Sequence, residues 1–178
     1  MSDLILVAGS PGSGKTTLAE TLARDLGIRL LSRDAIKEAY VRAEGKCHEE
    51  LPDANLIASR AFFTEIEALL AGGPLIAEAA FQHAVWSKAL ARLPHAINLL
   101  LLHCRVSPEL AARRDRERRE ADADWARMHG AEAVTADDVA AWEAPRLGCP
   151  TLEVDTSAGY DPPLETIKEW ITEWLTTA

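Results

Sequence analysis

Hydrophobic residues along this chain form short continuous runs, and between the runs lie longer stretches in which hydrophobic residues recur at helical spacing. A short run bounded by turn residues is typical of a buried strand, and the longer stretches predict amphipathic helices. The predicted strands cover residues 4–8, 28–31, 75–77, 97–104 and 151–154. The predicted helices cover residues 15–26, 34–44, 52–73, 85–93, 108–128 (one helix or two), 135–142 and 162–175.

Strands and helices alternate from the first predicted element to the last, and no repeat or low-complexity tract interrupts them. Such alternation is typical of a parallel sheet that helices cover on both faces. The longest apolar run, residues 97–104, fits a strand that is buried on both sides. The pattern therefore predicts a three-layer α/β fold with about five parallel strands, in a single domain over residues 1–178.

Composition and charge narrow the class of protein. Hydrophobic residues make up 48% and charged residues 26% of the 178, which is ordinary for a globular domain. No apolar stretch approaches the roughly 20 residues that cross a bilayer. Because the first residues lead directly into a predicted strand, we expect no signal peptide. We therefore expect a cytoplasmic protein without a membrane partner. The net charge of −9 favours a small binding partner over a long nucleic acid, whose phosphates attract a basic surface.

Residues 9–16, Gly-Ser-Pro-Gly-Ser-Gly-Lys-Thr, match the phosphate-binding pattern G-x-x-x-x-G-K-[ST]. They follow the first predicted strand and begin the first predicted helix, which is the context that a P-loop requires. Its glycines allow backbone N–H groups to surround a phosphate, and the helix N-terminus adds positive charge. We expect Lys15 to reach the β- and γ-phosphates and the Thr16 hydroxyl to bind Mg²⁺. The residues predicted to hold the nucleotide are Gly9, Pro11, Gly12, Ser13, Gly14, Lys15, Thr16 and Thr17.

This motif predicts a P-loop NTPase fold, and the rest of the sequence narrows the choice within that class. A GTPase would need an NKxD-type segment, and an ABC ATPase an LSGGQ-type signature; the sequence contains neither. An AAA+ machine would normally carry a strand ending in Asp-Glu and a separate helical lid domain, for which 178 residues leave little room. By elimination, a small phosphoryl-transfer enzyme remains.

The second predicted strand runs into Ser32-Arg33-Asp34, and Lys37 follows three residues later. In these positions the chain resembles the P-loop kinases of the polynucleotide-kinase and zeta-toxin-like group, which includes small antibiotic kinases. The resemblance implies that Asp34 is the general base for the acceptor hydroxyl and that Lys37 contacts an anion. The place of Asp34 supports its role independently, because open α/β sheets bind ligands at the carboxyl ends of their strands. The alternative for Asp34 is an N-cap of a helix over residues 35–44, and both roles are compatible.

Glu78 follows the apolar residues 75–77, at the strand end where P-loop proteins place the acidic residue that meets Mg²⁺ through water. Acceptor binding is the rival role for Glu78, and a purely structural role is a third. The candidate metal-binding residues are Thr16 and Glu78, and the candidate substrate-binding residues are Asp34, Lys37 and Glu78.

Residues 113–119 contain five arginines, against the acidic balance of the whole chain. On a helix, Arg114 and Arg118 share one face. In the kinases that the chain resembles, this segment is a lid that closes over ATP, and its arginines contact the transferring phosphate. We therefore expect a lid over about residues 108–130; a solvated helix with Glu/Arg pairs is the alternative. The predicted catalytic residues are Lys15, Asp34, Arg114 and Arg118.

The sequence thus predicts an ATP- and Mg²⁺-dependent kinase that transfers the γ-phosphate to a hydroxyl of a small-molecule acceptor. Two alternatives stay open. One is a polynucleotide 5′-hydroxyl kinase, which the net charge disfavours. The other is a nucleotide-binding regulatory module without transfer activity.

Overall fold

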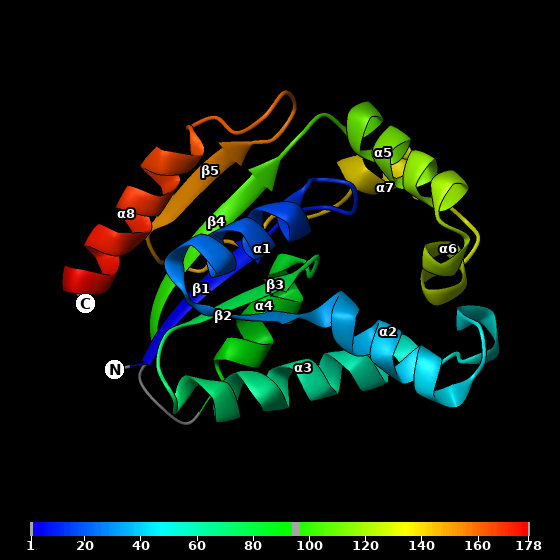
Figure 1. Cartoon of the computed structure of the whole chain (residues 1–178), viewed down its shortest axis with the longest axis horizontal. Coiled ribbons are helices and arrows are strands. Elements are labelled where there is room, and N and C mark those ends of the chain that lie inside the picture. The colour runs from blue at the N-terminus through cyan, green and yellow to red at the C-terminus, as the bar shows by residue number, and fades with distance from the viewer. Residues whose placement is uncertain (1, 94–96, 178) are drawn as a thin grey trace.

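Figure 1 shows the computed structural model of the chain, which describes residues 2–93 and 97–177. Over this part of the chain, five strands form one parallel sheet in the order β2-β3-β1-β4-β5. The strands are β1 (Ser2–Ala8), β2 (Arg29–Ser32), β3 (Leu75–Ala79), β4 (Ile97–Arg105) and β5 (Thr151–Asp155). The predicted α/β fold with a parallel sheet is therefore confirmed.

The helices flank this sheet and also extend beyond its carboxyl edge (Figure 1). In the described part of the chain they are α1 (Lys15–Leu26), α2 (Arg33–Glu44), α3 (Ala54–Leu70), α4 (His83–Leu90), α5 (Pro108–Ala121), α6 (Ala123–His129), α7 (Ala136–Ala140) and α8 (Leu164–Thr177), with a short 3₁₀ helix η1 (His48–Glu50). Every predicted helix is present. Helix α4 begins two residues and ends three residues earlier than the helix predicted over residues 85–93. The 3₁₀ helix η1 was not predicted, because it lies in a segment without hydrophobic periodicity.

Two hydrophobic layers hold the helices to the sheet, because alternate strand residues point to opposite faces. Leu4 and Leu6 of β1 share one layer with residues of α3 and α4. Ile5 and Val7 share the other layer with residues of α1 and α8. All four side chains are fully buried. This burial on both faces explains why the strands read as continuous apolar runs.

An aromatic cluster packs α3 and α4 against the sheet. The ring centroid of Phe62 lies 5.4 Å from that of Phe63, 5.8 Å from that of Phe81 and 5.9 Å from that of Trp86. All three pairs are edge-to-face, the arrangement that aromatic quadrupoles favour. Phe62 and Trp86 are fully buried, so the cluster belongs to the core.

Replacing Phe62 by alanine is expected to lower the free energy of unfolding by about 3–5 kcal/mol, because it removes a buried ring and leaves a cavity. Denaturant unfolding followed by circular dichroism measures the change. Leu56→Ala in the same helix is the matched control, because Leu56 is 49% exposed and surface changes usually stay within about 0.5 kcal/mol. Equal midpoints for the two variants would contradict the assignment of Phe62 to the core.

The structure corrects one interpretation of Asp34. The N-cap of α2 is Ser32, whose Oγ accepts a hydrogen bond from the backbone N–H of Ala35 at 3.4 Å. The helix begins at Arg33, one residue earlier than predicted, and Asp34 lies in its first turn. Asp34 as N-cap is therefore wrong, and its carboxylate is not used in capping.

The charged segment forms two helices, which was one of the two predicted outcomes. Asp122 ends α5 in an extended conformation (φ −132°, ψ 95°), which no helix continues. Its side chain then caps α6 by accepting a hydrogen bond from the backbone N–H of Trp125 at 2.9 Å. The break turns α6 toward α2 (Figure 1), against which it packs.

Among the described residues, no helix is both long and apolar enough to span a bilayer.

Candidate active site

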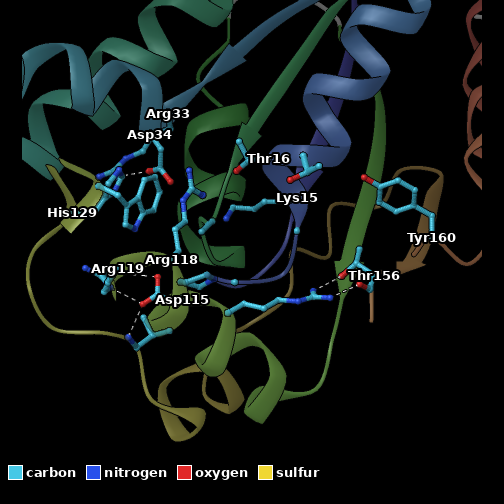
Figure 2. A pocket seen from close by; sticks show the side chains of 18 of the residues that line it. Lys15, Thr16, Arg33, Asp34, Asp115, Arg118, Arg119, His129, Thr156 and Tyr160 are labelled. Atoms are coloured by element: carbon cyan, nitrogen blue, oxygen red, sulfur yellow. Dashed lines mark hydrogen bonds and ion pairs between the residues drawn. The ribbon is translucent and has the colours of Figure 1, made fainter. Parts of the chain in front are cut away.

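A cavity of about 510 Å³ lies at the carboxyl ends of the strands, between the P-loop and residues of α2, α5 and α6. Figure 2 shows Lys15 and Thr16 in its middle, with Asp34 to one side and Tyr160 to the other. The position agrees with the rule that open parallel sheets bind ligands at this edge. The predicted site residues that line the cavity are Pro11, Gly12, Gly14, Lys15, Thr16, Thr17, Asp34, Arg114 and Arg118.

Glycines give the P-loop a conformation that other residues would strain. Gly12 and Gly14 have φ angles of 75° and 76°, and a Cβ on Gly12 would lie 2.2 Å from the carbonyl oxygen of Ala111 in α5. Gly14 is also the N-cap of α1, where no side chain caps the first turn, so N–H groups there are available to an anion. Gly9 and Ser13 lie beneath the loop, where a Cβ on Gly9 would come 2.3 Å from Ser13 Oγ. They shape the loop and do not line the cavity.

Three polar side chains surround the carboxylate of Glu78 next to the P-loop. Its Oε1 accepts a hydrogen bond from Thr16 Oγ1 at 3.2 Å and lies 3.7 Å from Lys15 Nζ. Its Oε2 accepts a hydrogen bond from Ser32 Oγ at 2.8 Å. Burial raises the pKa of Glu78, although the positive charge of Lys15 opposes this shift. The side chain is only 1% exposed, so Glu78 supports Lys15 and Thr16 from behind the cavity wall.

Thr16 and Glu78 form an oxygen-donor pair that fits a Mg²⁺ ion bound together with a nucleotide. Mg²⁺ prefers oxygen ligands and keeps several waters, so one or two protein groups beside the phosphates suffice. The hydroxyl and the carboxylate are already 3.2 Å apart. In residues 2–93 and 97–177, no group of three His, Cys, Asp or Glu side chains could hold a metal ion.

Asp34 faces the cavity from the first turn of α2. Its Oδ1 lies 3.0 Å from Arg33 NH1, and the same guanidinium donates to Asn55 Oδ1 at 2.7 Å. Burial works to raise the pKa of Asp34, but the positive charges of Lys15, protonated His129 and Arg33 outweigh it and lower the pKa overall. The carboxylate is therefore ionised at neutral pH and able to accept a proton.

The arginine run of α5 divides between cavity and solvent. Arg114 donates to the carbonyl oxygens of Thr156 at 2.8 Å and of Ser157 at 3.0 Å, and so ties α5 to the loop after β5. Arg118 reaches into the cavity (Figure 2) and makes no hydrogen bond to the described residues. The remaining three arginines are Arg113 and Arg116, which are exposed, and Arg119, which lines the cavity.

An aromatic pair on α6 lines the cavity in addition to the predicted residues. The rings of Trp125 and His129 stack with centroids 3.6 Å apart, and His129 Nε2 lies 3.0 Å from Glu38 Oε1. The guanidinium of Arg118 lies 3.5 Å from the centre of the Trp125 ring, in cation–π contact. The i, i+4 spacing of the pair is the one sequence signal for a shared face. The spacing shows only that the two residues share a face of α6. Which way that face points depends on the break at Asp122.

Lys37 lies one helical turn beyond Asp34 on α2 and is only 3% exposed. Its ammonium group has no hydrogen bond or ion pair with any described residue. Burial lowers the pKa of Lys37 to about 8; the charges of Arg33 and Arg119 act in the same direction, and that of Asp34 opposes them. Lys37 is therefore a buried cation behind the wall that carries Asp34.

The P-loop, the parallel sheet order and the helices over its carboxyl edge define a P-loop protein. More particularly, the chain belongs to the protein family described as "AAA domain", whose profile matches residues 4–145. A search among curated proteins found no match.

Solved structures of similar fold include several kinases. A candidate kinase from Chloroflexus aurantiacus J-10-fl has 25% sequence identity and a TM-score of 0.80, over 99% of this chain and 97% of the other. A gluconokinase from Sinorhizobium meliloti 1021 has 17% identity and a TM-score of 0.56, over 99% and 92%. A shikimate kinase from Acinetobacter baumannii, in complex with shikimate, has 16% identity and a TM-score of 0.51, over 99% and 94%. These likenesses confirm the resemblance to P-loop kinases.

Proposed function

We propose that this protein is an ATP- and Mg²⁺-dependent kinase that transfers the γ-phosphate to a hydroxyl of a small-molecule acceptor. One observation carries the proposal: the ionised carboxylate of Asp34 faces the same cavity as Lys15 and the P-loop. A nucleotide-binding module without transfer activity has no use for a proton acceptor in that place. The description of the Chloroflexus aurantiacus protein as a candidate kinase supports the same reaction class.

The P-loop side of the cavity binds the triphosphate in this proposal. Backbone N–H groups around Gly12 and Gly14 bind the phosphate oxygens, and the ammonium of Lys15 neutralises the charge that develops on transfer. The hydroxyl of Thr16 and the carboxylate of Glu78 would hold Mg²⁺, which would supply positive charge to offset that of the phosphates. These roles follow from the donors present and from their place beside the cavity.

Asp34 serves the acceptor side of the cavity. The acceptor hydroxyl gives its proton to the carboxylate while its oxygen forms a bond to the γ-phosphorus. The bond between that phosphorus and the oxygen bridging it to the β-phosphate breaks, and ADP leaves with the electron pair. Arg118, on a lid formed by residues 108–130, meets the transferring group. Catalysis of this kind consists mainly of positioning and charge stabilisation.

The test is a screen of purified protein with ATP and Mg²⁺ against a panel of small alcohols and antibiotics, with the phosphorylated product identified by mass spectrometry. A 5′-hydroxyl oligonucleotide belongs in the same panel. Transfer to a small alcohol is the expected result. Efficient transfer to the oligonucleotide alone would replace the proposed acceptor class, and tight ATP binding without transfer to any acceptor would favour a regulatory module.

The two cavity arginines are expected to differ in their effects. Arg118→Ala should lower kcat by about 10²–10³-fold, because it removes a charge that stabilises the transition state. Arg114→Ala should instead raise the KM for ATP by about tenfold with a smaller change in kcat, because Arg114 fixes the loop at Thr156. Steady-state kinetics with varied ATP separates the two.

Arg116→Ala is the matched control for both variants, because Arg116 lies on the same helix and does not line the cavity. It should leave both constants unchanged. A loss of kcat in the Arg116 variant equal to that in the Arg118 variant would mean that the charge of α5 acts as a whole and that no single arginine contacts the phosphate.

A further inference from the structure

The arginines of α5 that line the cavity differ in how the protein holds them. Arg114 donates to the carbonyl oxygen of Thr156 at 2.8 Å. Arg119 pairs with Asp115, also at 2.8 Å. Arg118 reaches into the cavity (Figure 2) and has no hydrogen bond to any residue in the described part of the chain. What holds Arg118 is the face of an indole ring.

The ring of Trp125 is covered on both of its faces. The guanidinium carbon of Arg118 lies 3.5 Å from the ring centre. The imidazole of His129 has its centroid 3.6 Å away and its plane inclined by 22°. Both separations are ordinary contact distances, so the two groups would collide if they lay over the same face. The indole is therefore clamped between His129 of its own helix and Arg118 of α5.

The imidazole in this stack is itself fixed by a residue of another helix. His129 Nε2 lies 3.0 Å from Glu38 Oε1 on α2, and the His129 side chain is only 8% exposed. The stack thus runs from α2, the helix that carries Asp34, through α6 to Arg118 on α5. The orientation of Arg118 is determined by these three helices together.

An aromatic ring holds a guanidinium differently from a carboxylate. The negative face of the ring attracts the cation without accepting a directed hydrogen bond. At 3.5 Å no N–H group fits between the guanidinium carbon of Arg118 and the ring, so the guanidinium lies flat on the indole. Its N–H donors then point outward in the guanidinium plane and remain free for a bidentate contact with phosphate. A carboxylate partner, as Arg119 has, would use these donors and neutralise the charge.

We propose that Trp125 is a positioning residue for phosphoryl transfer: its ring holds Arg118 in the cavity with the N–H donors free for the transferring phosphate, and His129 fixes the ring. Because both faces of the ring are covered, no flat acceptor stacks on Trp125. The inference rests on the proposed kinase function and adds Trp125 to its machinery.

The first arm of the test is a double-mutant cycle between Trp125 and Arg118, with kcat measured for the acceptor found in the screen. Trp125→Leu should lower kcat by about threefold to tenfold while Arg118 is present. In the Arg118→Ala background the same change should alter kcat by less than about twofold, because no guanidinium is left to position. Losses that multiply in the double variant would overturn the inference, since Trp125 would then act without Arg118.

A conservative variant separates the ring from its N–H group. Trp125 Nε1 is buried and makes no hydrogen bond to any described residue, and Trp125→Phe removes this N–H but keeps an aromatic face. Its kcat should exceed that of Trp125→Leu, whereas an equal kcat would overturn the role of the ring. Trp174→Leu is the matched control, because Trp174 is also half-buried but lies on α8 and does not line the cavity. It should leave kcat unchanged, and a loss equal to that of Trp125→Leu would count against the inference.

The second arm measures binding and needs neither an acceptor nor turnover. Calorimetry with Mg²⁺ gives the Kd of ADP and of a non-hydrolysable ATP analogue, and the ratio of the two reports the contact with the γ-phosphate. Trp125→Leu should lower the preference for the analogue by about threefold, with the Kd of ADP within about twofold. In the Arg118→Ala background it should leave the preference unchanged.

The two arms distinguish failure of the inference from failure of the kinase function. Absence of transfer to every acceptor counts against the kinase function, and the binding arm then decides whether Trp125 holds Arg118 against the γ-phosphate. A preference for the analogue that Trp125→Leu does not change would overturn the inference in that case. Trp125→Met, whose flexible side chain fills irregular space, replaces the leucine variant if the latter does not fold.

Discussion

Replacing Asp34 by asparagine is expected to lower kcat by about 10²–10⁴-fold and to leave the Kd for ATP within about twofold. The asparagine is nearly isosteric, and its carbonyl oxygen can still accept the hydrogen bond that Arg33 donates to Asp34 at 3.0 Å. It cannot take a proton from the acceptor hydroxyl. Single-turnover kinetics with the acceptor found in the screen measures the chemical step, and calorimetry with ATP measures the affinity.

The pH dependence of the wild-type enzyme provides a second check on Asp34. Because neighbouring positive charges hold its pKa below the ordinary aspartate range, the base loses its charge only when the pH falls below that range. No acid limb that belongs to Asp34 should therefore be seen in kcat/KM above about pH 5. Asp34→Glu keeps a carboxylate and should retain more turnover than the asparagine variant. Full turnover in Asp34→Asn would remove Asp34 from the mechanism.

The sequence was sufficient to predict the fold because local and long-range signals agree. The strands are apolar on both faces, and the glycines at positions 27 and 45 end α1 and α2 in the left-handed conformation that favours this residue. The P-loop motif added the phosphate-binding turn, since its spacing ties a strand to a helix. Sheet order could not be read in this way, because the pairing of β1 with both β3 and β4 depends on contacts distant in sequence.

The candidate site was predictable where a residue follows a strand, and less so elsewhere. Asp34 and Glu78 were found because strand ends of a parallel sheet meet at one edge. The positions of Trp125 and His129 in the cavity wall could not be predicted with the same support, since they depend on the turn that Asp122 imposes between two helices. The unpaired state of Lys37 also has no sequence signal. It results from the absence of a carboxylate within ion-pair distance in the folded chain that the structure describes.

Replacing Lys15 by methionine is expected to lower kcat/KM for ATP by about 10³-fold or more, because the ammonium group both binds the phosphates and offsets their developing charge. It is also the nearest cation to Glu78, at 3.7 Å. Burial already raises the pKa of Glu78, and Lys15 is the largest influence that opposes the shift. In the variant, the buried carboxylate of Glu78 loses the positive charge that stabilises its ionised form. The fold then becomes less stable, and this alone would also reduce activity.

The double variant Lys15→Met, Glu78→Gln separates these two causes. A glutamate whose folded-state pKa is raised destabilises the fold once the pH exceeds the ordinary glutamate range, since the unfolded chain releases that proton more readily. The stability of Lys15→Met should therefore fall as the pH rises above the ordinary glutamate range, as followed by thermal unfolding between pH 5 and pH 8, roughly the range of maximal stability for most proteins. Glutamine carries no charge and can still accept hydrogen bonds from Thr16 and Ser32, so the double variant should lose this pH dependence and remain inactive. Recovery of activity together with stability would show that Lys15 acts through Glu78 and not on the nucleotide.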